Sequence, residues 1–209
     1  MLAMLLGSYV LAGDANAGDL REISRVNQSI SIEDSEQVGD VSSVNGGIRI
    51  ADGAKAFEVS TINGSIILGD DVQVSSAQTV NGRIRVGNNV SVRGSLETVN
   101  GSIRTDRGSN IESAIETVNG SINIRNTHVG NDIKTANGDI DILHGSVVEG
   151  DVIVRGKRHW WDRFFEFSRS RPELTIDSDS SVLGDIHLYQ DVELNIASDA
   201  VVGEIIEHF

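Results

Sequence analysis

The sequence predicts an all-β protein: a single-domain parallel β-helix, also called a β-solenoid, of about ten coils of 18–19 residues. Three observations carry this prediction. A short motif returns at a nearly constant spacing, apolar residues within each repeat stand two apart, and no repeat sustains a helical period. An asparagine marks each copy of the motif; the seven are Asn27, Asn45, Asn63, Asn81, Asn100, Asn119 and Asn137.

Within one repeat, the apolar residues follow the period of a strand with one buried face. Ile66 and Leu68 stand two apart, as do Val72 and Val74, and the next repeat copies these offsets. Valine and isoleucine dominate such positions, as expected for a pleated, half-buried surface. We therefore expect two or three short strands per coil, with parallel pairing between coils at about 4.8 Å. The general preference of parallel crossovers predicts a right-handed winding.

The asparagines predict a corner in each coil and a ladder between coils. Asparagine tolerates the left-handed backbone conformation and the glycine that usually follows adopts it freely, so the pair suits a sharp corner. Asparagines stacked in register would also form hydrogen bonds along one edge. Neither glycosylation sequons nor β-hairpins, which use the same residues, explain a constant period.

Composition and charge exclude several classes of function. The chain has 209 residues, one proline, no cysteine and a net charge of −14. Nucleic-acid binding needs a basic surface, so we expect no nucleic-acid partner. Without cysteine there are no disulfides and no thiol chemistry. At about 4.8 Å per coil, ten coils form a rod on the order of 50 Å long.

The N-terminal residues 1–17 predict a signal peptide. An apolar run fills residues 1–12, and Ala15-Asn16-Ala17 fits the small-x-small rule for signal-peptidase cleavage. No basic residue precedes Arg21, so we expect a signal peptide truncated at its start, with an uncleaved anchor as the alternative. Residues 18–209 would then form the solenoid, exported to the periplasm or surface of a bacterium.

One coil carries an insertion at residues 156–171. Gly150 and Gly184 occupy the same place in a second motif, but the stretch between them is almost twice as long as the stretch from Gly184 to Gly203. Residues 155–171 carry a net charge of +4, against −18 for the rest, and include both tryptophans. The candidate contact residues of this basic-aromatic insertion are Arg158, Trp160, Trp161, Arg163, Phe164 and Phe165.

Three interpretations fit the insertion. The first is that it packs against a flank of the rod, the second that it contacts an envelope protein or a glycan, and the third that it lies in a membrane interface. The sequence alone leaves these alternatives open, and the partner is unknown.

The sequence offers little evidence for catalysis. Five histidines lack a metal-ligating spacing, and no nucleophile elbow or phosphate-binding loop is present, so we expect no metal, no cofactor and no enzyme. The acidic pairs Asp70-Asp71 and Asp139/Asp141 leave a polysaccharide-active β-helix enzyme as the third hypothesis.

Two resemblances add an expected function. The spelling Val-Asn-Gly-Ser-Ile-x-Ile, as in residues 118–124, resembles exported bacterial adhesin-like β-solenoids over about residues 24–154. This resemblance implies a non-catalytic envelope protein, an adhesin-like or structural binding scaffold. The spelling Ser-x-Val-x-Gly-Asp-Ile, at residues 180–186, is similar to bactofilins. That likeness implies the alternative, a polymer that self-associates end to end through its terminal coils.

Overall fold

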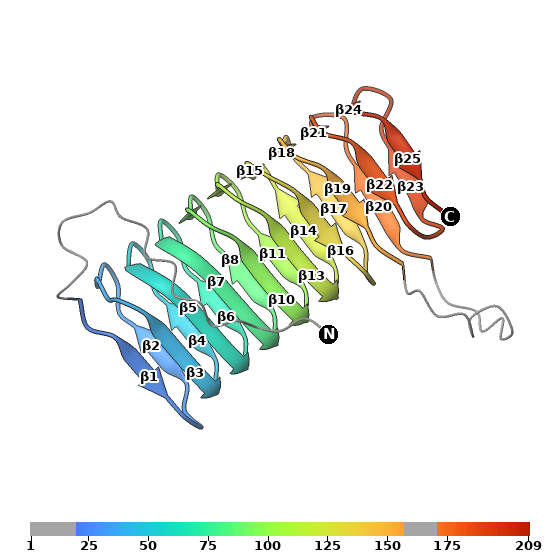
Figure 1. The fold of residues 1–209 in the computed structure, drawn as a ribbon. Helices are drawn as coiled ribbons and strands as arrows, with labels where there is room; N and C mark the ends of the chain where they lie inside the picture. The colour runs from blue at the N-terminus through green and yellow to red at the C-terminus, as the bar shows by residue number, and fades with distance from the viewer. Residues whose placement is uncertain (1–19, 157–170) are drawn as a thin grey trace, which may run out of the picture.

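The computed structural model describes residues 20–156 and 171–209, and in these ranges every regular element is a β-strand. The strands wind into one parallel β-solenoid whose coils stack in chain order from the N-terminal to the C-terminal end (Figure 1). The predicted all-β, single-domain solenoid is confirmed, with about nine turns. Its right-handed winding stays a prediction. No helix in the described ranges is long and apolar enough to cross a bilayer.

Each coil contributes strands to two sheets. The nine-stranded sheet contains β2 (Ile30–Ile32), β4 (Ile48–Ile50), β6 (Ile66–Leu68), β8 (Ile84–Val86), β11 (Ile103–Thr105), β14 (Ile122–Arg125), β17 (Ile140–Leu143), β20 (Glu173–Ile176) and β23 (Glu193–Ile196). The 16-stranded sheet contains β1 (Ile23–Arg25), β3 (Val41–Asn45), β5 (Lys55–Asn63), β7 (Gln73–Asn81), β9 (Ser91–Val92), β10 (Leu96–Asn100), β12 (Asn110–Ile111), β13 (Ile115–Asn119), β15 (His128–Val129), β16 (Ile133–Thr135), β18 (Val147–Val148), β19 (Val152–Val154), β21 (Ser181–Val182), β22 (Ile186–Leu188), β24 (Val201–Val202) and β25 (Ile205–Glu207).

All strand pairs are parallel and join equivalent residues of successive coils. In the nine-stranded sheet Ile84 pairs with Ile66 on one side and with Ile103 on the other. Because side chains alternate along a strand, this constant register sends one set of residues inward in every coil. The core is therefore a stack of aliphatic side chains; Ile66, Ile103 and Ile122, for example, are all 0 % exposed.

The strands before and after the insertion pair in the same register as the other coils. Val152 pairs with Ile186 in one sheet and Ile140 pairs with Leu174 in the other, although the extra residues lie between the partners of each pair. The coils before and after residues 156–171 therefore stack as ordinary neighbours, and the extra residues leave from a corner between β19 and β20. The predicted signal peptide, residues 1–17, lies outside the described residues.

Candidate functional site

A ladder of asparagine side chains runs along one corner of the solenoid. In each step the Nδ2 of one asparagine donates to the Oδ1 of the asparagine one coil earlier, at 2.7 to 3.0 Å. The six bonds join all seven predicted residues, from Asn27 to Asn137, without a gap. The hydrogen-bonded ladder predicted from the spacing is confirmed, and it fixes the register of the coils along this edge.

The predicted reason for the following glycine is wrong for most of the ladder. Among the seven asparagines only Asn27 has a positive φ, of 60°, and among the glycines that follow them only Gly138 does, with 151°. A Cβ on Gly64 would instead overlap the carbonyl oxygen of Gly46, one coil earlier, and the same overlap recurs at Gly82. The corner needs glycine because successive backbones approach too closely for a side chain.

A row of buried hydroxyls supports the same corner from inside, and this row was not predicted from the sequence. Each hydroxyl donates to the corner carbonyl of the preceding coil at 2.9 to 3.3 Å; the donors are Ser43, Thr61, Thr79, Thr98, Thr117 and Thr135. The available signal was a serine or threonine two positions before six of the seven asparagines. No buried side-chain N or O in the described ranges lacks a partner.

The second sequence motif, Gly-Asp or Gly-Glu, also joins coils. The Oδ1 of Asp132 accepts the backbone N–H of Asp151, and the Oδ1 of Asp151 accepts that of Asp185, both at 2.9 Å. Burial by itself raises the pKa of Asp132, but the Asp151 N–H and the ammonium of Lys134 lower it, and the net pKa is below its ordinary value. These carboxylates are structural acceptors.

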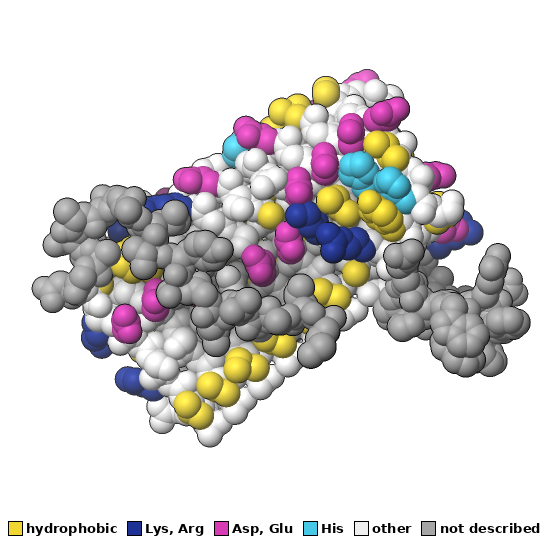
Figure 2. Space-filling view, in the orientation of Figure 1, with side chains coloured by type: hydrophobic (Ala, Val, Ile, Leu, Met, Phe, Trp, Pro, Cys, Tyr) yellow, Lys and Arg dark blue, Asp and Glu magenta, His cyan; other side chains and the backbone are white. Residues whose placement is uncertain are grey.

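Histidine side chains gather beside cationic residues near the C-terminal end (Figure 2). The His187 Nδ1 lies 3.1 Å from the His208 Nε2, its Nε2 lies 3.6 Å from the Asp151 Oδ2, and Tyr189 stacks on His208 with ring centroids 4.3 Å apart. Throughout residues 20–156 and 171–209, no three His, Cys, Asp or Glu side chains converge as a metal site.

An apolar stripe lies next to the asparagine ladder. The residue before each asparagine points outward, and four of these side chains are exposed by 37 to 63 %: Val26, Val44, Ile62 and Val118. Figure 2 shows a diagonal row of hydrophobic side chains along this part of the molecule. The stripe presents one aliphatic side chain per coil.

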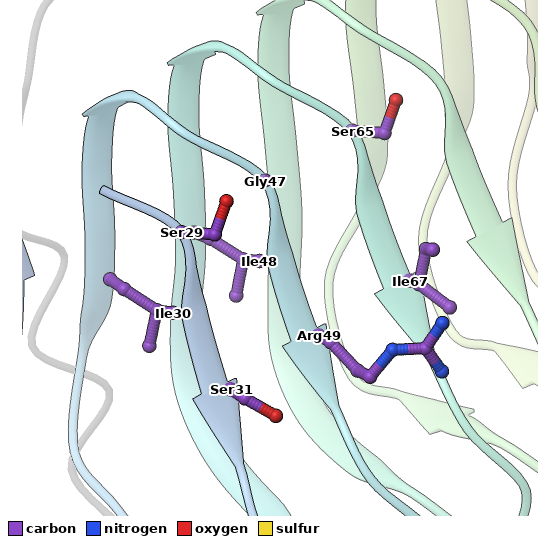
Figure 3. Close-up of a pocket in the computed structure, with 8 residues that line it drawn as sticks. All are labelled: Ser29, Ile30, Ser31, Gly47, Ile48, Arg49, Ser65 and Ile67. Atoms are coloured by element: carbon purple, nitrogen blue, oxygen red, sulfur yellow. The ribbon is translucent and has the colours of Figure 1, made fainter. Parts of the chain in front are cut away.

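The outer face of the nine-stranded sheet has a shallow depression of about 370 Å³ at its N-terminal end. Its lining includes Ser29, Ser65 and the outward side chains of Ser31, Arg49 and Ile67. In Figure 3, Ser31, Arg49 and Ile67 point to one side of β2, β4 and β6, whereas Ile30 and Ile48 point to the other. The depression is open, its lining mixes serines with isoleucines, and Arg49 is the one cation in that lining.

Charge on this outer face changes sign along the rod. The stretch from β4 to β14 has, at outward positions in or beside its strands, five arginines and one carboxylate: Arg49, Arg83, Arg85, Arg104, Arg125 and Asp106. The stretch from β17 to β23 has only carboxylates: Asp139, Asp141, Glu173, Asp177 and Glu193. We call these the basic half and the acidic half of the face.

The carboxylate pair considered for catalysis takes part in bonds between coils. The Oδ1 of Asp139 accepts the backbone N–H of Glu173 at 3.0 Å, and the Oδ2 of Asp141 accepts the Nδ2 of Asn123 at 2.7 Å. Both side chains lie on the outer face of β17 or directly before it. Arg158, Trp160, Trp161, Arg163, Phe164 and Phe165 lie outside the described residues, so their predicted contacts stay predictions.

Comparison with known proteins found no matching family model, no matching curated protein and no matching solved structure. The architecture is that of a β-helix repeat protein.

Proposed function

We propose that this protein is a non-catalytic scaffold of the bacterial envelope, exported and adhesin-like or structural in role. One observation carries the proposal: every coil presents side chains at the same outward positions, in constant register and about 4.8 Å apart. An extended, repetitive surface of this kind is what solenoid proteins use to bind partners.

Three further features support the proposal. The acidic pair Asp139/Asp141 is engaged by the N–H of Glu173 and the amide of Asn123, which fits a structural role better than acid–base chemistry. The apolar residues 1–12 and the Ala15-Asn16-Ala17 spelling support export. Likeness of the 118–124 spelling to adhesin-like solenoids points to the same role.

Export is tested by fractionating bacteria that express the full chain and measuring the intact mass of the recovered protein. The proposal expects periplasmic or surface-bound protein that begins at Gly18. A full-length species in the cytoplasm would refute export. Turnover of polyuronates that disappears in Asp139→Ala and Asp141→Ala variants would refute the non-catalytic role.

A second candidate is a bactofilin-like polymer that grows end to end. The 180–186 spelling supports it, as do Val201 and Ile205, which are 61 % and 40 % exposed on the last described coil. Electron microscopy of purified protein would reveal filaments under this hypothesis, and short monodisperse particles would exclude it.

The basic-aromatic insertion is the proposed partner contact of the envelope scaffold. Pull-down from envelope extract with the wild-type chain and with a deletion of residues 156–171 tests it. Loss of a captured protein or glycan on deletion supports the contact, and an unchanged set of captured molecules argues that the insertion only packs.

A further inference from the structure

We propose that two copies of this chain pair face to face through the outer surface of the nine-stranded sheet, in antiparallel orientation. The two-fold axis would run parallel to the strands and between β11 and β14, so that the basic half of each copy covers the acidic half of the other. This pairing goes beyond the envelope role and does not depend on it.

The register of the sheet determines which residues would meet. A rotation about an axis parallel to the strands preserves strand direction and reverses the order of the coils. With the axis between β11 and β14, strand β8 faces β17 of the other copy, β4 faces β23, and β11 faces β14. Residues at the same position along the two facing strands then come together.

The facing positions carry opposite charges. Arg85 in the middle of β8 meets Asp141 in the middle of β17, and Arg83 before β8 meets Asp139 before β17. Because the contact is two-fold symmetric, each of these pairs occurs twice. At the end of the face, Arg49 of β4 lies diagonally across from Glu193 of β23.

The centre of the face is complementary as well. Asp106, directly after β11, meets Arg125 at the end of β14. Within one chain Asp106 already lies 3.4 Å from the Arg104 Nε and 3.9 Å from an Arg85 nitrogen, both partly exposed contacts. Arg85 and Arg104 thus share one carboxylate within a chain. Carboxylates of the other copy would add ion-pair partners across the interface.

Other arrangements place like charges together. An axis along the rod would place each coil opposite the same coil of the partner, so that Arg85 in the middle of β8 faces Arg85 of the other copy. A linear polyanion would cover the basic half alone and leave the acidic half unexplained. Only the antiparallel pairing uses both halves of the face.

The available area suits a dimer of moderate affinity. The eight facing strands, from β4 to β23, extend over roughly 38 Å at about 4.8 Å each, and the outward positions span roughly 15 Å along the strands, so each copy would contribute on the order of 600 Å². Stable interfaces contribute about 800 Å² per partner. The dimer would therefore depend strongly on its charge pairs.

The test is sedimentation equilibrium of the full chain at physiological salt, with paired charge reversals. One variant carries Arg83→Glu and Arg85→Glu, and the other carries Asp139→Arg and Asp141→Arg. The wild-type chain should form dimers, and each variant alone should have a dissociation constant raised at least about tenfold. A one-to-one mixture of the two variants should recover the wild-type dimer, because each reversed pair then faces the other.

Controls separate this pairing from effects of net charge and folding. A Lys55→Glu and Arg93→Glu variant makes the same change in net charge on exposed residues in or beside the other sheet, and it should dimerise like wild type. The Asp-to-Arg variant reduces the magnitude of the net charge, from −14 to −10. If net charge alone controlled association, weaker repulsion would give tighter self-association, the opposite of our expectation. Circular dichroism melting verifies that each variant folds.

Several outcomes would overturn the proposal. These are a wild-type monomer at 100 µM, a dimer or open-ended polymer insensitive to both reversals, and a mixture that stays monomeric. A monomeric wild-type chain that binds polygalacturonate through the basic half would also overturn the proposal, since that result identifies a polyanion as the occupant of this face.

Discussion

Replacing Gly64 with alanine tests whether close backbone approach sets the spacing at the asparagine corner. The new Cβ would overlap the carbonyl oxygen and carbon of Gly46 and would lie 2.9 Å from the backbone nitrogen of Gly47. These atoms belong to the backbone of the neighbouring coil, so they do not move aside as a flexible side chain would. The two coils must therefore separate locally.

The structure gives the size of the effect. The Gly46 carbonyl accepts the Thr61 hydroxyl at 2.9 Å, and Asn63, beside the substituted residue, donates to Asn45 at 2.8 Å. Losing or weakening these bonds costs about 1 kcal/mol each, and forcing a methyl group into a filled space costs about 1–3 kcal/mol. We expect Gly64→Ala to lower the free energy of unfolding by about 3–5 kcal/mol.

Gly47→Ala is the matched control. It lies on the same corner, has no positive φ, and its Cβ would meet only the Ser65 carbonyl, at 3.3 Å. We expect a change within about 1 kcal/mol, because a tight contact is offset by the reduced freedom of the unfolded chain. Urea denaturation followed by circular dichroism measures both variants. Equal losses for the two, or a loss below about 0.5 kcal/mol for Gly64→Ala, would refute the reasoning.

Three further predictions concern other hydrogen bonds between coils. Thr98→Val keeps the shape but leaves the Gly82 carbonyl without its 3.0 Å donor, so it should cost about 1–3 kcal/mol, and Thr98→Ser should recover most of the loss in the same urea assay. Asn81→Ala removes two ladder bonds between exposed side chains and should cost about 1–2 kcal/mol; a cost equal to zero would show that the ladder does not stabilise the fold. The pKa of Asp132 is lowered in the folded state, so its stabilising contribution is present at neutral pH and is lost as pH falls below the ordinary value of 3.8 and through the folded pKa. Asp132→Asn should therefore flatten the acid limb of a plot of unfolding free energy against pH, and an unchanged limb would contradict the sign of the shift.

The sequence was sufficient to predict the features that repeat along the chain. The asparagine period gave the coil length and the ladder, and the paired Val and Ile positions gave the strands and the aliphatic core. The enlarged spacing between Gly150 and Gly184 located the insertion. Each of these signals is a single residue type at a constant offset, so it can be recognised in the sequence without the structure.

Other features depend on distances between coils and were not predicted. The threonines before the asparagines resemble ordinary strand residues until the structure places their hydroxyls beside a carbonyl of the preceding coil. The role of glycine was predicted wrongly because the local φ preference of Asn-Gly does not report how closely two backbones approach. The opposite charges of Arg85 and Asp141 lie far apart in the sequence and become related only through the order of strands in the sheet.

Disulfide trapping along the asparagine edge tests the in-register stacking most directly, because the chain contains no cysteine of its own. Equivalent Cα atoms of adjacent coils lie about 4.8 Å apart, within the range that a disulfide spans, whereas those two coils apart lie about 9.6 Å apart, beyond it. The stacked solenoid predicts rapid oxidative cross-linking in the Asn81→Cys and Asn100→Cys double variant and none in the Asn81→Cys and Asn119→Cys double variant. Cross-linking of the second pair, or failure of the first in a folded protein, would contradict the register on which every other conclusion rests.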